Sequence, residues 1–317
     1  MVNEKNQFHE IRSDRKSVPF RKKSEDFRRR IFGKTPSAIV FNSLLYIFFI
    51  LLAAVMLYPF LYVVTESMKT VIPTDTGIPK YAYSLEAYAA VFRIEGWTWS
   101  FVWSFIVVIV SVVTHVFFCM LTAYPLSKRH LRGRTFFLVY ILITMLFSGG
   151  LIPYYMLIQD IGLMDNPLVY IIPGLVSAFD VIIAKNFLAG IPVDLEEAAK
   201  LDGANDYLIF FRIYMPLSLP IMATLALWCG VGKWNDWMTG VLYMPNSPDM
   251  QLIQNYLRRI LVDASSSTGG MGDTTIKNMA QSVQMATIVV GTLPIVMIYP
   301  FVQKYFVKGV ILGSIKG

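Results

Sequence analysis

The chain has little charge, little cysteine and little histidine. Only 15% of its 317 residues are Asp, Glu, Lys or Arg, while 55% are hydrophobic, and the mean hydropathy is +0.54. This balance excludes an ordinary soluble domain of the same length and predicts a membrane protein. The two cysteines, Cys119 and Cys229, both fall inside apolar stretches, so we interpret them as small buried hydrophobes rather than a disulfide or a metal pair.

Sequence patterns that would indicate catalysis are missing as well. The stretch Gly230-Val231-Gly232-Lys233-Trp234 has two glycines and a lysine, but it lacks the spacing, the final Ser or Thr and the strand context of a phosphate-binding loop. No group of His, Asp and a nucleophile falls on facing apolar stretches, which argues against an enzyme embedded in the membrane. We therefore expect no catalytic residue, no metal and no cofactor in this chain.

The chain does contain a series of long apolar runs. The first, from Ala38 to Val64, has no charged side chain and, at about 1.5 Å per residue, exceeds the roughly 30 Å hydrocarbon core of a bilayer. The further candidate spans run from about Trp99 to Leu126, Phe136 to Leu157, Pro167 to Leu188, Leu217 to Leu242 and Ala280 to Val307. The predicted fold class is therefore all-α, a polytopic membrane protein with six transmembrane helices.

Lys304 lies at the end of the last span, and the fourth and fifth spans carry four further charged residues. They are Asp180, Lys185, Lys233 and Asp236, and each would cost about 2.5 to 3.5 kcal/mol at the bilayer centre. We expect these residues near a span end or facing a cavity lined by protein, with Lys185 reaching the inner interface. His115 in the second span is expected to be packed and hydrogen-bonded rather than to relay protons.

The positions of the basic residues predict the orientation. Residues 1–37 form a leader rich in Lys and Arg, and the link between the second and third spans carries Lys128, Arg129, Arg132 and Arg134 without an acid. By the positive-inside rule, both termini and the segment between the fourth and fifth spans are expected in the cytoplasm of a multi-pass protein of the cell membrane.

The leader and the rest of the chain are expected to form two parts, residues 1–37 and a transmembrane domain at 38–317. A basic tail beside a first span is typical of a topology determinant that contacts anionic lipid, so the net charge of +7 indicates membrane lipid and not nucleic acid as a partner. The first apolar run is too long for a cleaved signal peptide, and we interpret it as a retained anchor. A short amphipathic helix is predicted at Leu252 to Leu261, in an outer loop.

Between the fourth and fifth spans the sequence predicts a helix, a glycine turn and a second helix. Asp194 is a suitable N-cap, and Glu197 three residues later completes a capping box. Ala198 and Ala199 favour helix, and Gly203 supplies the left-handed residue that commonly ends one. The predicted unit is a short Ala-rich helix at the inner face of the membrane.

The continuation of this segment fits the same plan. Asn205 or Asp206 would cap a second helix that runs through Ile213, and Pro216 suits the first turn of the fifth span.

The whole segment resembles the EAA motif of bacterial ABC importer permeases. That motif reads Glu-Ala-Ala, three residues, Gly, nine residues, Ile, one residue, Leu, Pro. The matching positions here are Glu197, Ala198, Ala199, Gly203, Ile213 and Pro216. Met215 stands in place of the Leu, a change that keeps volume and apolarity. Six matches at the family's spacing make the resemblance specific.

The resemblance implies a mechanical function. In that family this loop is the coupling helix, which docks in a cleft of a cytoplasmic ATPase subunit. The implied coupling residues are Glu197, Ala198, Ala199, Asp202, Gly203, Ile213 and Pro216. The implied partners are a second homologous permease subunit, two ATPase subunits that handle ATP and Mg, and an extracytoplasmic solute-binding protein.

Other stretches look like the carbohydrate-uptake branch of the family. They are Gly149-Gly150-Leu151-Ile152-Pro153, Trp234-Asn235-Asp236-Trp237 and Phe301-Val302-Gln303-Lys304-Tyr305-Phe306-Val307-Lys308-Gly309. The chain is similar to the second permease of maltose-type importers and to the group associated with oligosaccharides from complex polysaccharides. The resemblance therefore implies half of a translocation path for a carbohydrate, an oligosaccharide in particular.

Two alternatives remain open from the sequence. Trp234, Asn235, Asp236 and Trp237 would line a substrate path, because aromatic faces stack on sugars and polar groups bind hydroxyls. They would equally form an aromatic belt with a polar helix end, in which Lys233 and Asp236 neutralise each other. The alternative function is a secondary transporter driven by an ion gradient, for which His115 and Asp236 are weak candidates.

Overall fold

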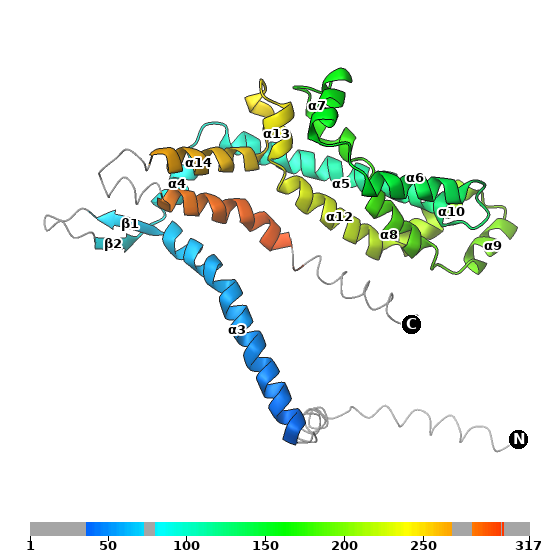
Figure 1. The fold of residues 1–317 in the computed structure, drawn as a ribbon, viewed down its shortest axis with the longest axis horizontal. Coiled ribbons are helices and arrows are strands. Elements are labelled where there is room, and N and C mark those ends of the chain that lie inside the picture. The colour runs from blue at the N-terminus through cyan, green and yellow to red at the C-terminus, as the bar shows by residue number, and fades with distance from the viewer. Residues whose placement is uncertain (1–35, 73–79, 268–280, 299, 301–317) are drawn as a thin grey trace, which may run out of the picture. The chain divides into compact units, whose positions relative to one another are not determined.

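The computed structural model describes residues 36–72, 80–267, 281–298 and 300. These residues are almost entirely helical (Figure 1). The long elements are α3 (Pro36–Ser67), α5 (Trp97–Ser127), α6 (Arg134–Leu146), α7 (Leu151–Asp160), α8 (Ala178–Leu188), α12 (Leu219–Trp234) and α14 (Ile253–Ser267), with a further helix at Gln281–Ile298. The leader before residue 36 and the carboxyl-terminal stretch from Phe301 lie outside the described residues.

The all-α prediction is confirmed apart from one small hairpin. Strands β1 (Lys69–Ile72) and β2 (Lys80–Tyr83) pair antiparallel, with Lys69 opposite Tyr83. The hairpin lies between α3 and α5 in the chain and is followed by the short helix α4 (Glu86–Phe92). The predicted amphipathic helix is present as α14.

The apolar helices agree with six spans when bent pairs are taken together. Among the described residues, three helices can each cross a membrane alone: Ile39–Ser67, Trp97–Ser127 and Gln281–Ile298. Three further pairs qualify only jointly, and they bend by 112° between α6 and α7, by 45° before α8 and by 77° before α12. The third, fourth and fifth spans are thus broken rather than straight, which the apolar runs did not indicate.

Each break has a local cause. Between α6 and α7 the chain passes Gly149 and Gly150, and Gly150 has φ of +87°, a backbone that favours glycine. The fourth span begins with 3-10 helices η1 (Pro167–Tyr170) and η2 (Ile172–Gly174), each with a proline in its first turn. Ser218 separates α11 (Met215–Leu217) from α12, with Pro216 before it and Pro220 after it.

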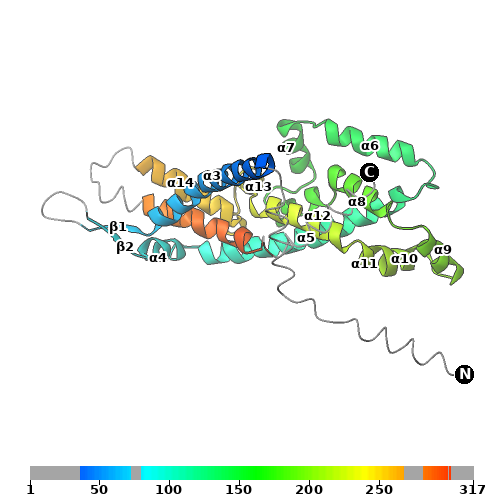
Figure 2. The same ribbon diagram turned by 90° about the horizontal axis from the view of Figure 1, so that it is seen from below.

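The core is built where α5, α8 and α12 pack together. Its buried side chains come from these helices and from the segment that joins α8 to α12. They include Cys119, Met120, Ala123, Val181, Ala184, Leu188, Phe210, Tyr214 and Leu225. Considered by itself, the compact unit Val63–Gly317 contains this core and every site discussed below. Figure 2 shows the connecting segment at one end of the α5, α8 and α12 group, and α14 at the other.

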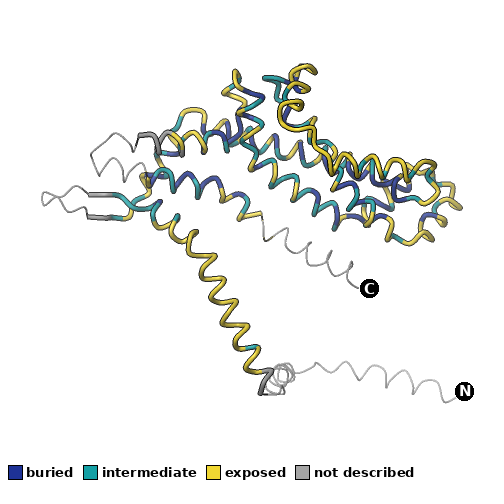
Figure 3. The backbone as a smooth tube through the Cα atoms, viewed as in Figure 1, coloured by how far each residue is buried: buried dark blue, intermediate teal, exposed yellow. Residues whose placement is uncertain are grey.

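Several apolar helices stay exposed in the isolated chain. α6 buries none of its residues, and the 18-residue apolar window of α3 buries none either (Figure 3). Large side chains such as Phe136, Tyr140 and Leu146 are more than half exposed. Exposure of this extent would aggregate a soluble protein, whereas it suits helices that face lipid or another subunit.

Candidate functional site

The segment between α8 and α12 forms a helix, a turn and a second helix. α9 (Asp194–Leu201) ends before Gly203, whose φ of +83° is the left-handed conformation that the sequence predicted. Asn205 then caps α10 (Asp206–Ile209), because its Oδ1 accepts from the Leu208 N–H at 2.9 Å. The predicted turn and second cap are both confirmed.

The predicted capping box at the start of α9 is wrong. Val193, with φ −65° and ψ −29°, already has helical backbone angles and occupies the N-cap position without a side-chain bond. Asp194 and Glu197 therefore both lie within the first turn. There their carboxylates complement the positive end of the helix dipole instead of capping it.

The second helix is not regular. After α10 the chain forms a π-helical turn, η3 (Phe210–Tyr214), and continues into α11. π-helical turns are rare in proteins, and many of those that occur lie at functional sites. Ile213 is half-buried in this turn, and Pro216 is exposed.

The outward face of α9 carries the motif residues. Glu197, Ala198, Asp202 and Gly203 are exposed, and Ala199 is half-buried against the core. Leu201, on the same outer side, is 89% exposed. In the described part of the chain, the Glu197 side chain makes no hydrogen bond or ion pair. A glutamate, two small residues and an exposed leucine are thus presented together on one surface.

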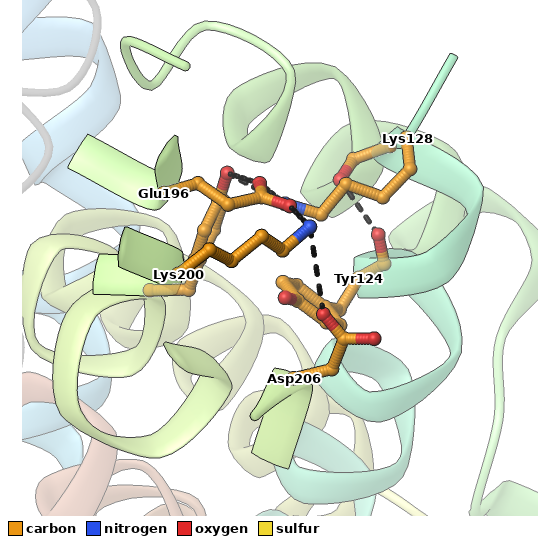
Figure 4. A network of polar contacts seen from close by, with 7 residues as sticks. Tyr124, Lys128, Glu196, Lys200 and Asp206 are labelled. Carbon is orange, nitrogen blue, oxygen red and sulfur yellow. Dashed lines mark hydrogen bonds and ion pairs between the residues drawn. The ribbon is translucent and has the colours of Figure 1, made fainter. Parts of the chain in front are cut away.

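The inward face of α9 is fixed by one buried glutamate. Glu196, with a side chain only 7% exposed, accepts from Lys128 at the end of α5, from Tyr214 Oη at 2.9 Å and from Lys200 Nζ at 2.8 Å (Figure 4). Lys128 in turn donates to Tyr214 Oη at 2.6 Å. Three elements, α5, α9 and η3, are therefore joined at one carboxylate.

Aromatic rings and a second acid complete this network. The Lys128 ammonium lies 3.8 Å from the centre of the Tyr214 ring and 4.4 Å from that of Tyr124. Cation–π contacts of this kind are strengthened when water is excluded. Lys200 also lies 3.8 Å from Asp206, which links α9 to α10 (Figure 4). We call the set Tyr124, Lys128, Glu196, Lys200, Asp206 and Tyr214 the Glu196 network.

The charges in the network support one another. Burial alone would raise the pKa of Glu196, but hydrogen bonds from Lys128, Lys200 and Tyr214 outweigh it and lower the pKa from 4.5 to about 2. Burial lowers the pKa of Lys128 despite its contact with Glu196, while the bond to Glu196 raises the pKa of Lys200. At neutral pH the carboxylate is ionised.

Sequence reasoning missed the centre of this network. The i, i+4 spacing of Glu196 and Lys200 signals a local pair, but it gives no sign that Glu196 faces inward. Lys128 was interpreted only as a topology signal. Its burial beside Glu196 depends on tertiary packing between residues far apart in the chain.

Two ionisable groups inside the spans, His115 and Asp180, contact each other. His115 on α5 contacts the Gly174 carbonyl through Nδ1 at 2.7 Å and Asp180 Oδ2 through Nε2 at 2.9 Å. Both ring nitrogens face acceptors, an arrangement that suits the imidazolium form. His115 is therefore packed and hydrogen-bonded as predicted. Lys185 lies half-buried in the last turn of α8, and a position near the end of the span was expected for it.

The four proposed path residues lie in different surroundings. Trp234 is 4% exposed, packs against Phe101 and Phe105, and donates from its indole to the Gly291 carbonyl at 2.8 Å. Asn235 is exposed, and Asp236 and Trp237 are half-buried. In this conformation Trp234 supports the core, whereas its three neighbours reach the surface.

Asp236 and Trp237 also have partners of their own. Asp236 accepts from the Thr239 N–H at 3.1 Å and from Thr239 Oγ1 at 2.8 Å, and it lies 3.8 Å from Lys233. The guanidinium of Arg258 on α14 lies 3.5 Å from the centre of the Trp237 ring. The predicted Lys233–Asp236 contact is therefore present.

This arrangement defines a polytopic helical membrane protein with a short helix, exposed on one face, between two spans. Comparison with known proteins places it more closely. YtcP of Bacillus subtilis strain 168, described as a polygalacturonan/rhamnogalacturonan transport system permease protein, is 39% identical over 283 residues, covering 88% of this chain and 99% of that protein. LplC of the same organism is 39% identical over 269 residues, covering 83% and 90% respectively.

A solved structure gives the same result. One chain of a bacterial ABC transporter involved in the import of the acidic polysaccharide alginate matches with a TM-score of 0.76 and 30% sequence identity, covering 86% of this chain and 99% of that one. No family model matches. The chain belongs to the family of ABC importer permeases, in its carbohydrate-uptake branch.

Proposed function

We propose that this chain forms half of the translocation path of an ATP-driven oligosaccharide importer, with α9 as its coupling helix. ATP and Mg are handled by two separate ATPase subunits, one of which receives α9 in a surface cleft. The observation that carries the proposal is the division of α9 into two faces. Glu197, Ala198 and Leu201 are exposed on the outer face, while Glu196 fastens the opposite face to the bundle.

The Glu196 network gives this coupling a physical route. A force on α9 reaches α5 through Lys128 and reaches the start of the fifth span through Tyr214. Side chains that are buried and paired hold their positions, so α9 and the end of α5 move as one body. The residues proposed to meet the ATPase are Glu197, Ala198, Ala199, Asp202 and Gly203, with Ile213 and Pro216 shaping the return into the membrane.

The remaining partners follow from the family. A second homologous permease subunit completes the path, and an extracytoplasmic solute-binding protein delivers the substrate. In this arrangement both termini and α9 lie in the cytoplasm, and residues 1–37 precede a transmembrane domain at 38–317. Exposed apolar helices such as α6 support contact with lipid and with the second subunit.

The relatives support an oligosaccharide as substrate. Besides YtcP, similar proteins include AraQ of Bacillus subtilis, an arabinooligosaccharides transport system permease protein that is 26% identical over 293 residues. Asn235, Asp236 and Trp237 are the path residues that reach the surface, and Trp234 supports them from the core. An ion-gradient mechanism is disfavoured, because the solved structure that this chain resembles is an ABC transporter.

Reconstitution tests the proposal directly. The chain would be purified with its second permease and ATPase subunits and placed in liposomes with the binding protein. ATP-dependent uptake of an oligosaccharide is the expected result, and Glu197→Lys should abolish it while membrane insertion persists. Uptake that runs on an ion gradient without ATP would contradict the proposal.

A further inference from the structure

One intramembrane cation has no hydrogen-bond acceptor among the residues that the structure describes. Lys233, in the last turn of α12, has a side chain 18% exposed, and its nearest acid is Asp236 Oδ2 at 3.8 Å. That separation is too long for a hydrogen bond. Both oxygens of Asp236 are already engaged by Thr239. The three N–H donors of the ammonium are therefore left for another acceptor.

The depth of Lys233 in the membrane makes an ammonium without a hydrogen-bond acceptor unfavourable in free energy. Its Cε and Nζ lie 3.4 and 3.5 Å from the place that a Cβ on Gly174 would occupy, and the Gly174 carbonyl contacts His115. His115 lies 12 residues before Ser127, the last residue of α5. At about 1.5 Å per residue this is about 18 Å along the helix, well inside the roughly 30 Å hydrocarbon core. An ionisable group at such a depth marks a functional site by default.

The charge of Lys233 also points to the kind of ligand. A lysine ammonium binds carboxylates through charge-assisted hydrogen bonds, which are stronger than bonds to neutral sugar hydroxyls. The relative YtcP is described for polygalacturonan and rhamnogalacturonan, and the solved alginate importer for an acidic polysaccharide. Galacturonate units carry one carboxylate each. Trp237 follows Lys233 closely in the chain. A second cation, the guanidinium of Arg258, stacks on the Trp237 ring.

We propose that Lys233 binds the carboxylate of a uronate-containing oligosaccharide as it passes through the membrane. The inference rests on the proposed importer function and adds the substrate class and the residue that selects it. Gly174 borders the same site, since the Lys233 Cε and Nζ lie beside its Cα. Asp236, held in place by Thr239, returns as the partner when the ligand leaves.

Uptake by the assembled importer tests this proposal. Trigalacturonate would be supplied on saturated binding protein to liposomes that contain wild type, Lys233→Gln, Lys233→Arg or Lys185→Gln. Lys185 is a matched control, because it is another half-buried lysine within the spans. We expect uptake to fall at least about 10-fold in Lys233→Gln and to stay within about twofold of wild type in the other two variants.

The possible outcomes distinguish the role of Lys233 from the proposed importer function. Wild-type uptake by Lys233→Gln, equal losses in Lys233→Gln and Lys233→Arg, or an equal loss in Lys185→Gln would each overturn the role of Lys233. If Lys233→Gln assembles poorly, Lys233→Met repeats the test with an apolar side chain of similar length. A wild-type importer that takes up neutral raffinose but not trigalacturonate would overturn this inference and leave the proposed importer function standing. Uptake that proceeds without ATP would instead contradict the proposed function itself.

Discussion

Glu196 is a buried charged side chain and Lys233 a half-buried one, and they differ in how they are partnered. Glu196 receives hydrogen bonds from Lys128, Lys200 and Tyr214, which come from three parts of the chain. Lys233 has Asp236 3.8 Å away, and that acid is held by Thr239. A fully paired charge fixes the chain around it, whereas an underpaired charge is available to a ligand. The Glu196 network therefore makes the α9 end of the bundle rigid, whereas Lys233 is available to bind a ligand in its interior.

The largest expected effect comes from the exposed face of α9. Glu197→Lys reverses an acid that has no partner among the described residues, so we expect no measurable oligosaccharide uptake and weaker co-purification of the ATPase subunits. Asp194→Lys is the control, since it reverses another acid of the same first turn outside the motif. Full uptake by Glu197→Lys would show that the ATPase does not use this face.

The next effect concerns the buried ion pair of Glu196 and Lys128. Glu196→Gln and Lys128→Met each leave a partner uncompensated, and breaking a buried pair costs about 3 to 5 kcal/mol. The double variant removes both charges and should recover part of that loss. Thermal unfolding of the purified subunit, analysed as a double-mutant cycle, would measure the coupling energy. Strictly additive losses would mean that the two side chains do not act together.

The sequence predicted the frame of this site but not its centre. The α9 helix and its Gly203 turn follow from local rules, because alanines favour helix and the turn needs a left-handed residue. Which face of α9 turns inward is not local. It depends on Lys128 and Tyr214, which lie 68 residues before Glu196 and 18 residues after it.

Two other differences have similar causes. Trp234 is buried, whereas its neighbours up to Trp237 reach the surface. The sequence does not show this difference, because it arises from the packing of Trp234 against Phe101 and Phe105. The sequence does not predict the hairpin of β1 and β2, because each strand has only four residues, too few for a clear alternating pattern.

Acid should reduce the contribution of Glu196 to the stability of the protein. The pKa of Glu196 is depressed from 4.5 to about 2, so its contribution to stability is complete above about pH 4.5 and disappears as the pH falls toward 2. This contribution is at most about 3 kcal/mol. The difference in melting temperature between wild type and Glu196→Gln should therefore be constant near neutral pH and shrink below pH 4.5. A difference that grows in acid would contradict the assigned ionised state.

The smallest effect concerns the turn after α9. Gly203 has φ of +83°, so Gly203→Ala should destabilise the segment by about 1 to 2 kcal/mol. Gly232→Ala is the matched control, because that glycine lies inside α12 and a methyl group added there would meet nothing within 4 Å. Hydrogen exchange of the α9 and α10 amides would detect the change. Equal protection in both variants would mean that the turn tolerates a side chain.

The side of the membrane on which α9 lies tests the central claim most directly. Ala198→Cys would be introduced into a chain whose two native cysteines, Cys119 and Cys229, are replaced by alanine. A membrane-impermeant maleimide should label the new cysteine in inside-out vesicles but not in intact cells, and bound ATPase subunits should protect it. Labelling of intact cells would place α9 outside and contradict its function as a coupling helix.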